Sequence, residues 1–288
     1  EMFTKNRSMA VSLWGAAIFA ALALNAPRTS EGEEEASGPP LRISAQMESG
    51  FLAVLKHRAQ FSKDGTRFDY RREGGQDVLF FNQRFRIEAD FGRGHSVSVL
   101  YQPLRLETEV SLSRTVRVDG LDFPAGTNVD LLYDFPFYRA SYLYDFLPRQ
   151  DGVLAVGFSF QIRNATILFR SADGSLLREN RDVGFVPLLK VRGRLPMGSG
   201  FWAEVEADGV WASISVLNGS DEEIVGALLD ASLRAGATYK RLDVFATVRY
   251  LGGGAEGTNE DESGPGDGYV SNWLQFFVAT VGFKATLF

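Results

Sequence analysis

Hydrophobic and polar residues alternate with a period of two along much of the chain. In the segments 189–195 and 201–211 every second residue is apolar or small. The residues between them are charged, positive in the first segment and negative in the second: Lys190, Arg192, Arg194, Glu204, Glu206 and Asp208. Successive side chains of a β-strand point to opposite faces, and opposite charges attract across a strand pair. The pattern therefore predicts a β-hairpin with one apolar face and one charged face.

The same alternation recurs from the first third of the chain to its end. The further segments that show it are 77–91, 129–147, 153–170, 225–239, 241–250 and 273–287. Two of them lose the phase once, near Phe137 and near Asn164, and we interpret each slip as a bulge or a strand end. The pattern indicates an all-β chain of about ten antiparallel strands, with eight or twelve as alternatives.

Short and long connections alternate between these segments. The short ones are 92–95, 147–152, 196–200 and 240–243, and the long polar ones are 104–128, 171–182, 213–224 and 252–268. In an antiparallel sheet, this order places every short connection at one end. The predicted fold is an antiparallel transmembrane β-barrel with short periplasmic turns and long extracellular loops.

A soluble sandwich or a lipocalin-like barrel also alternates, but its apolar face points inward. Several strands here run to roughly 10–16 residues, which is near the length that crosses a bilayer at a tilt. Aromatic residues cluster at strand ends, as interfacial girdles do: Trp202, Trp211, Tyr239, Tyr250 and Trp273. These features favour the membrane barrel, with the charged faces turned to the lumen.

The N-terminus is typical of an exported protein. Lys5 and Arg7 precede an apolar run that ends at a small-residue cleavage motif, Ala21 and Ala23. We predict a signal peptide over 1–23, with a single membrane anchor as the alternative. An acidic leader is expected over 24–48 and the barrel over 49–288.

On these features the chain resembles bacterial outer-membrane β-barrel proteins over residues 49–288. The terminal Phe288 is similar to the aromatic residue by which the barrel assembly machinery recognises that class, although Leu287, one residue earlier, is in phase with the apolar face. The resemblance implies a location in the bacterial outer membrane. It also implies contact with outer-membrane lipid, lipopolysaccharide and the assembly machinery.

The amino-acid composition of the chain limits the kinds of functional site that it can form. The 288 residues include no cysteine and two histidines, and the formal net charge is -6. A disulfide framework, thiolate metal sites and a dominant nucleic-acid-binding surface are therefore excluded. His57 and His95 lack an evident catalytic partner, and the acidic run 256–267 lacks a regular cation-binding spacing. We predict no cofactor and no metal site, and the sequence does not indicate an oligomeric state.

The candidate functional residues are the charges expected to face the lumen. They are Lys190, Arg192, Arg194, Glu204, Glu206, Asp208, Asp230, Arg234, Asp243 and Arg249. Their balanced charge predicts an ion-paired plug that largely fills the lumen. The protein would then have a structural or surface-interaction role. The alternative is a narrow pore for small solutes whose charges select them, and a lipid-active or proteolytic enzyme is the third hypothesis.

Overall fold

The computed structural model describes residues 41–148, 152–213, 224–258 and 266–287, and the predicted signal peptide and most of the leader lie outside these ranges. Within the described residues, no helix is long and apolar enough to cross a membrane. The larger strands are β1 (Arg42–Phe61), β3 (Leu79–Asp90), β4 (His95–Gln102), β5 (Arg105–Ser111), β8 (Asn128–Asp134), β9 (Phe137–Asp145), β10 (Val153–Ser171), β11 (Leu177–Gly198), β12 (Phe201–Ser213), β13 (Val225–Tyr239), β14 (Leu242–Thr258) and β15 (Tyr269–Thr286). Short strands are β2 (Phe68–Asp69), β6 (Val116–Val118) and β7 (Leu121–Phe123).

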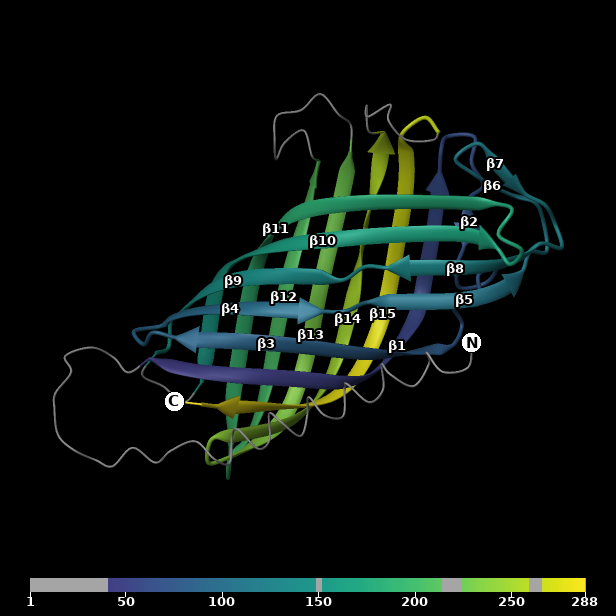
Figure 1. Cartoon of the computed structure of the whole chain (residues 1–288). Helices are drawn as coiled ribbons and strands as arrows, with labels where there is room; N and C mark the ends of the chain where they lie inside the picture. The colour runs from purple at the N-terminus through teal and green to yellow at the C-terminus, as the bar shows by residue number, and fades with distance from the viewer. Residues whose placement is uncertain (1–40, 149–151, 214–223, 259–265, 288) are drawn as a thin grey trace, which may run out of the picture.

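The large strands close into a barrel (Figure 1). Around the ring, the described strands follow the order β11, β12, β13, β14, β15, β1, β3, β4, β9 and β10, and β10 pairs with β11 to complete it. Beyond breaks near Pro103 and Pro136, β5 continues the wall from β4, and β8 continues it from β9. The register of the two pairs is the same, and both extensions run toward the end of the barrel that carries β6 and β7. Every pairing is antiparallel. The closed ten-strand barrel predicted from the alternation is therefore confirmed. A strand does end near Phe137, but the phase slip expected there is wrong, because odd-numbered residues face inward on both β8 and β9.

The short connections lie together at one end of the barrel. They follow β3, β9, β11 and β13, and the start of β1 and the end of β15 lie at the same end. In outer-membrane barrels the short turns are periplasmic, so this end is called the periplasmic end and the opposite one the extracellular end. The barrel starts earlier than expected, because β1 begins at Arg42 and so includes part of the predicted leader.

The extracellular end differs in detail from the prediction. The connection between β10 and β11 is a short turn over 172–176, and β14 extends to Thr258. Much of the expected loop 104–128 is β-structure, because β5 continues the barrel wall and β6 and β7 form a hairpin. Figure 1 shows this hairpin beyond the ends of β5 and β8.

The polarity of the barrel reverses along its axis. On the lower part of β10, Phe160 and Ile162 are exposed on the outer face while Gln161 is buried in the lumen. Further up, Phe169 is buried inside and Arg170 is exposed outside. The expected phase slip near Asn164 is therefore wrong. β10 keeps its phase, and the surroundings change where the strand leaves the membrane.

The upper lumen contains an apolar core instead of charges. Its buried members include Leu52, Val54, Phe61, Phe68, Tyr70, Leu104, Leu106, Val116, Phe123, Leu131, Tyr133, Phe169, Leu251, Phe276 and Val278. The segment 62–78 and the β6–β7 hairpin cover this core and join each other, since the Thr66 amide donates to the Arg117 carbonyl oxygen at 2.8 Å. The extracellular half is thus packed like a water-soluble protein.

Candidate functional site

The ten charges predicted to face the lumen lie on the inner faces of β11, β12, β13 and β14. Seven are almost fully buried: Lys190, Glu204, Glu206, Asp208, Asp230, Arg234 and Arg249. Arg192, Arg194 and Asp243 are half-buried nearer the periplasmic end. The alternation of each strand decides which side chains point inward, because outward positions face lipid and inward positions face the lumen.

The remainder of the barrel wall supplies partners that we did not include in the candidate set. They are Glu48 on β1, Arg84, Arg86 and Glu88 on β3, Arg139 on β9 and Lys284 on β15. The polar phase of the segment 77–91 already indicated the β3 residues. Glu48 was assigned to the leader, and the β8–β9 break obscured the phase of Arg139.

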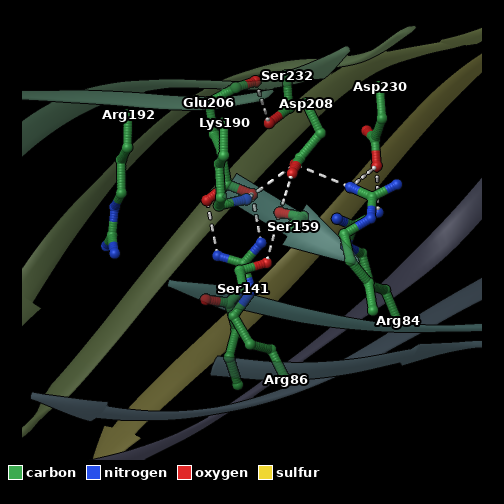
Figure 2. Close-up of polar contacts among 12 residues, drawn as sticks. Arg84, Arg86, Ser141, Ser159, Lys190, Arg192, Glu206, Asp208, Asp230 and Ser232 are labelled. Carbon is green, nitrogen blue, oxygen red and sulfur yellow. Dashed lines mark hydrogen bonds and ion pairs between the residues drawn. The ribbon is translucent and has the colours of Figure 1, made fainter. Parts of the chain in front are cut away.

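Glu206 is one centre of the resulting network (Figure 2). Arg86 donates through both terminal nitrogens, at 2.7 Å to Oε2 and also to Oε1. Lys190 Nζ lies 3.0 Å from Glu206 Oε1 and 2.8 Å from Asp208 Oδ2, so it bridges the two carboxylates. Arg234 Nη1 is 3.7 Å from Glu206 Oε2. One carboxylate from β12 thus joins cations from three other strands.

Asp230 is the second centre. Arg84 Nη1 and Arg139 Nη1 approach its Oδ2 at 3.0 and 2.9 Å, and Arg249 Nη1 approaches its Oδ1 at 2.9 Å. Arg139 Nη1 is also 2.8 Å from Asp208 Oδ2, which connects the two centres. Burying a charge is costly unless it is paired and hydrogen-bonded, and each of these carboxylates has several charged donors.

Neutral side chains add further hydrogen bonds to the network. Ser159 Oγ donates to Asp208 Oδ1 at 2.6 Å and lies 2.8 Å from Ser141 Oγ, as Figure 2 shows. Gln161 Oε1 accepts from Arg139 Nε at 3.0 Å, and Gln102 Oε1 accepts from Arg84 at 2.9 Å. These bonds cross-link the strands, although Arg84 Nε and Nη2, Arg86 Nε and Arg234 Nε are buried without a hydrogen-bond partner among the described residues.

The network continues toward the periplasm. Arg192 contacts Glu204 Oε2 at 3.0 Å and Glu88 Oε2 at 2.9 Å, and Lys284 Nζ contacts Glu88 Oε1 at 2.7 Å. Glu48 accepts from Arg234 and Arg249 at 3.2 Å each. Side chains from β1 and β3 therefore reach those from β11 to β14 across the lumen.

An aromatic residue lies at the periplasmic end of the lumen. Trp202, which we expected in an interfacial girdle, is buried inside, because it has the same parity as Glu204 on β12. Its ring lies 5.8 Å from that of Phe245, and the Arg194 guanidinium lies 3.9 Å from the ring centroid. A guanidinium above an indole ring gains a cation–π attraction.

Neither histidine occupies the position expected of a rim catalyst. A register shift between Val54 and Lys56 reverses the phase of β1, so His57 points inward. His57 is buried, with its ring 4.3 Å from Tyr70 and Nδ1 2.8 Å from Gln76 Oε1. His95 begins β4 beside a short periplasmic turn, where Nδ1 lies 2.8 Å from the Tyr142 hydroxyl.

The acidic run 256–267 is only partly described. Glu256 accepts from the Tyr269 hydroxyl at 3.0 Å, and Asp267 accepts from the Lys63 amide at 3.0 Å. Glu260, Asp261 and Glu262 lie outside the described residues. Among the residues that are described, no group of histidine, aspartate or glutamate side chains is arranged to hold a metal ion.

The outer face of the barrel carries a continuous apolar band. Its exposed residues include Phe51, Leu55, Phe81, Ile87, Val99, Phe158, Phe160, Ile162, Phe185, Leu189, Val191, Val205, Leu233, Val244, Val248, Phe277 and Val281. Exposed apolar area of this extent is unfavourable in water and stable in hydrocarbon. A closed barrel with a polar lumen and this outer face implies a lipid environment.

The chain matches no protein-family model and no curated protein sequence. Solved structures resemble it in overall form. The outer-membrane protease OmpT of Escherichia coli is 11% identical with a TM-score of 0.44, over 85% of this chain and 96% of that one. The translocator domain of the autotransporter NalP of Neisseria meningitidis is 13% identical with a TM-score of 0.37, over 96% of both chains. OprG of Pseudomonas aeruginosa is also 13% identical, with a TM-score of 0.33, over 84% of this chain and 95% of that one.

At such low identity, the classification rests on the molecule's own features. Its strands close without an edge, its lumen is polar at membrane depth, and its outer face is apolar at the same depth. Closed barrels are the one β-structure that satisfies every backbone group within a bilayer. The chain therefore has the closed transmembrane β-barrel fold.

Proposed function

We propose that this barrel is closed to solutes and acts as a rigid support for its extracellular surface. The observation that carries the proposal is that two different layers fill the lumen in series. The ion-paired layer around Glu206 and Asp230 occupies the membrane-depth part, and the apolar core around Phe276 and Phe169 occupies the part above it.

The two layers oppose passage by different means. A small ion entering the lower layer would have to displace side chains that are each held by several charged partners. A hydrated solute entering the upper layer would have to lose its water among apolar side chains. Thus neither a charged nor a neutral polar solute has a favourable route.

The covered upper core supports the second part of the proposal. The segment 62–78 and the β6–β7 hairpin are tied together by Ser62 Oγ, which donates to Asp119 Oδ1 at 3.0 Å, and by Arg117, which contacts Asp64 at 2.9 Å. A fixed surface of this kind suits recognition of other molecules of the cell envelope or its surroundings, such as lipopolysaccharide. A narrow pore is the alternative function.

Ion conductance of the refolded protein in planar lipid bilayers tests this proposal. Heat-modifiable gel migration first shows that the barrel has folded. If the folded protein gives no unitary current, the result agrees with the proposal that the barrel is closed to solutes. Steady unitary currents that change with Glu206→Gln would instead favour the pore and make the ion-paired layer its filter.

A further inference from the structure

A groove of about 470 Å³ crosses the outer face of β12, β13, β14, β15 and β1 at the extracellular edge of the apolar band. The strand register places its central positions in one row: Gly209, Leu229, Gly252, Gln275 and Lys56. Two outward positions in this row are glycine. The Tyr250 ring covers Gly252, whereas Gly209 leaves its position open, with the nearest atom to an added Cβ 3.5 Å away. The groove is therefore a depression in the lipid-facing surface.

Aromatic side chains border this depression. Trp211 and Trp273 lie in the next row up, and Tyr250 lies one step below on β14. Trp211 is 81% exposed. Tryptophan and tyrosine prefer the boundary between hydrocarbon and headgroups. Their position places the groove where the upper ends of acyl chains meet the headgroups of the outer leaflet.

Basic residues continue the groove on the extracellular side. Lys56 lines it, and Arg58, two residues further on the same face of β1, pairs in register with Trp273. Arg58 also lines a second hollow of about 290 Å³ with Arg67, Asp69, Arg72 and Glu73. The apolar and basic parts thus follow each other along the outside of one strand.

The carboxylates of the second hollow already have cationic partners. Asp69 Oδ2 contacts Arg58 Nε at 3.1 Å, and Glu73 Oε2 contacts Arg114 Nε at 2.7 Å. In the part of the chain that the structure describes, Lys56, Arg67 and Arg72 form no ion pair. The basic part therefore has a positive excess available to a ligand.

We propose that this groove binds one outer-leaflet lipid that carries a phosphorylated headgroup. An acyl chain lies over Gly209, between Trp211 and the Tyr250 ring that covers Gly252, and the phosphate lies among Lys56, Arg67 and Arg72. The apolar floor lies on the lipid-facing surface, so the occupant comes from the bilayer. Arginine and lysine pair strongly with phosphate, and basic pockets at the membrane surface bind anionic headgroups.

Tryptophan quenching by brominated lipids tests the proposal. The full chain is folded into phosphatidylcholine vesicles that contain a few mole per cent of either phosphatidic acid or phosphatidylcholine with brominated acyl chains. Two of the four tryptophans lie in the groove, whereas Trp202 faces the lumen at the other end. We expect phosphatidic acid to be enriched at the groove about tenfold over phosphatidylcholine.

Two variants separate the parts of the site. Replacing Lys56, Arg67 and Arg72 by glutamine removes the preference for phosphate, whereas the control Arg181→Gln on β11, whose side chain lines neither hollow, keeps it. Gly209→Leu fills the floor and lowers quenching by both lipids, and space exists for the new Cβ, whose nearest neighbour is 3.5 Å away. The outward-facing substitution Ala246→Leu on β14, below the groove, is its control.

Equal quenching by the two lipids in the native chain would overturn the proposal. So would a preference that survives the triple substitution, or quenching that Gly209→Leu leaves unchanged, in protein whose gel migration shows a folded barrel. Native mass spectrometry of the unaltered chain gives an independent readout. Retained phosphatidic acid supports the site, and retention of phosphatidic acid and phosphatidylcholine in equal amounts contradicts it.

Discussion

Arg192 lies opposite Glu206 in the register of β11 and β12, yet its guanidinium contacts Glu204, one pair nearer the periplasm, at 3.0 Å. Glu206 instead accepts from Arg86 on the far wall and from Lys190. The diagonal pairing arises because long side chains inside a narrow barrel also meet partners across the lumen. Hairpin neighbours alone therefore do not determine the ion pairs.

Removing the charge of Glu206 should destabilise the barrel by about 3–5 kcal/mol, because Arg86, Lys190 and Arg234 would lose a shared buried acceptor. Urea unfolding of Glu206→Gln in lipid vesicles measures the change. Glu107→Gln is the control, since Glu107 pairs with Arg105 on the exposed surface and should cost at most about 1 kcal/mol. Equal effects of the two substitutions would contradict a stabilising role for the buried network.

Leu233 is 52% exposed on the outer face of β13, within the apolar band. Leu233→Arg should cost roughly 2–4 kcal/mol, because it places a charge in hydrocarbon near mid-membrane. Val225→Arg, at the extracellular end of the same strand, should cost about 0–1 kcal/mol. Unfolding titrations of both variants in the same vesicles make the comparison. A similar cost at both positions would mean that the membrane boundary lies elsewhere.

Because the polarity reverses along β10, residues on its outer face should differ in their accessibility to water-soluble reagents. Cysteine is absent from the native chain, so single-cysteine variants have no background. In Phe160→Cys the thiol should be protected by lipid from a membrane-impermeant maleimide, whereas in Arg170→Cys it should be labelled rapidly. Labelling is measured in intact cells or sealed vesicles. Rapid labelling at both positions would show that β10 is in water throughout.

Acid should loosen the extracellular segment 62–78 before the barrel. The hydrogen bonds from Arg114 hold the pKa of the Glu73 carboxyl below its ordinary value. The associated stabilisation is thus present above the unfolded-state pKa of about 4.3 and is lost as the pH falls through the lower, folded-state value. Because Glu73 is largely solvated, the effect should stay below about 1 kcal/mol.

Hydrogen exchange of residues 62–78 as a function of pH measures this loss. We expect faster exchange at the acid end in the native chain, after correction for intrinsic rates. In Glu73→Gln the exchange should be fast already at neutral pH, with little further acid response. An unchanged acid response in that variant would assign the effect to another group.

The sequence predicted those features that depend on period-two alternation. The pairing of Lys190 with Asp208 in register follows from a hairpin whose two polar faces are both visible in the chain. The closed antiparallel ring follows from strand length and from the order of short and long connections. The local sequence pattern is sufficient for these features, because each lumen-facing residue must differ in polarity from the lipid-facing residues before and after it in the strand.

Features that depend on depth or on distant contacts could not be predicted. Near Asn164 the residue types exchange faces without any change of backbone phase, so alternation alone gives a false slip. At His57 the reverse occurs, since a bulge changes the phase without a clear sequence signal. The connection of Asp230 to Arg84 and Arg139 joins residues far apart in the chain. Only closure of the ring brings them together.

The upper apolar core includes Leu52 and Val54 from the first strand and Phe276 and Val278 from the last, and these pair directly as Leu52 with Val278 and Val54 with Phe276. An unclosed intermediate would leave these residues without their partners. The extracellular surface that rests on them can therefore take its final form only when the two ends of the barrel have met. Display of that surface is in this way a signal of complete assembly, and an interrupted barrel would not present it.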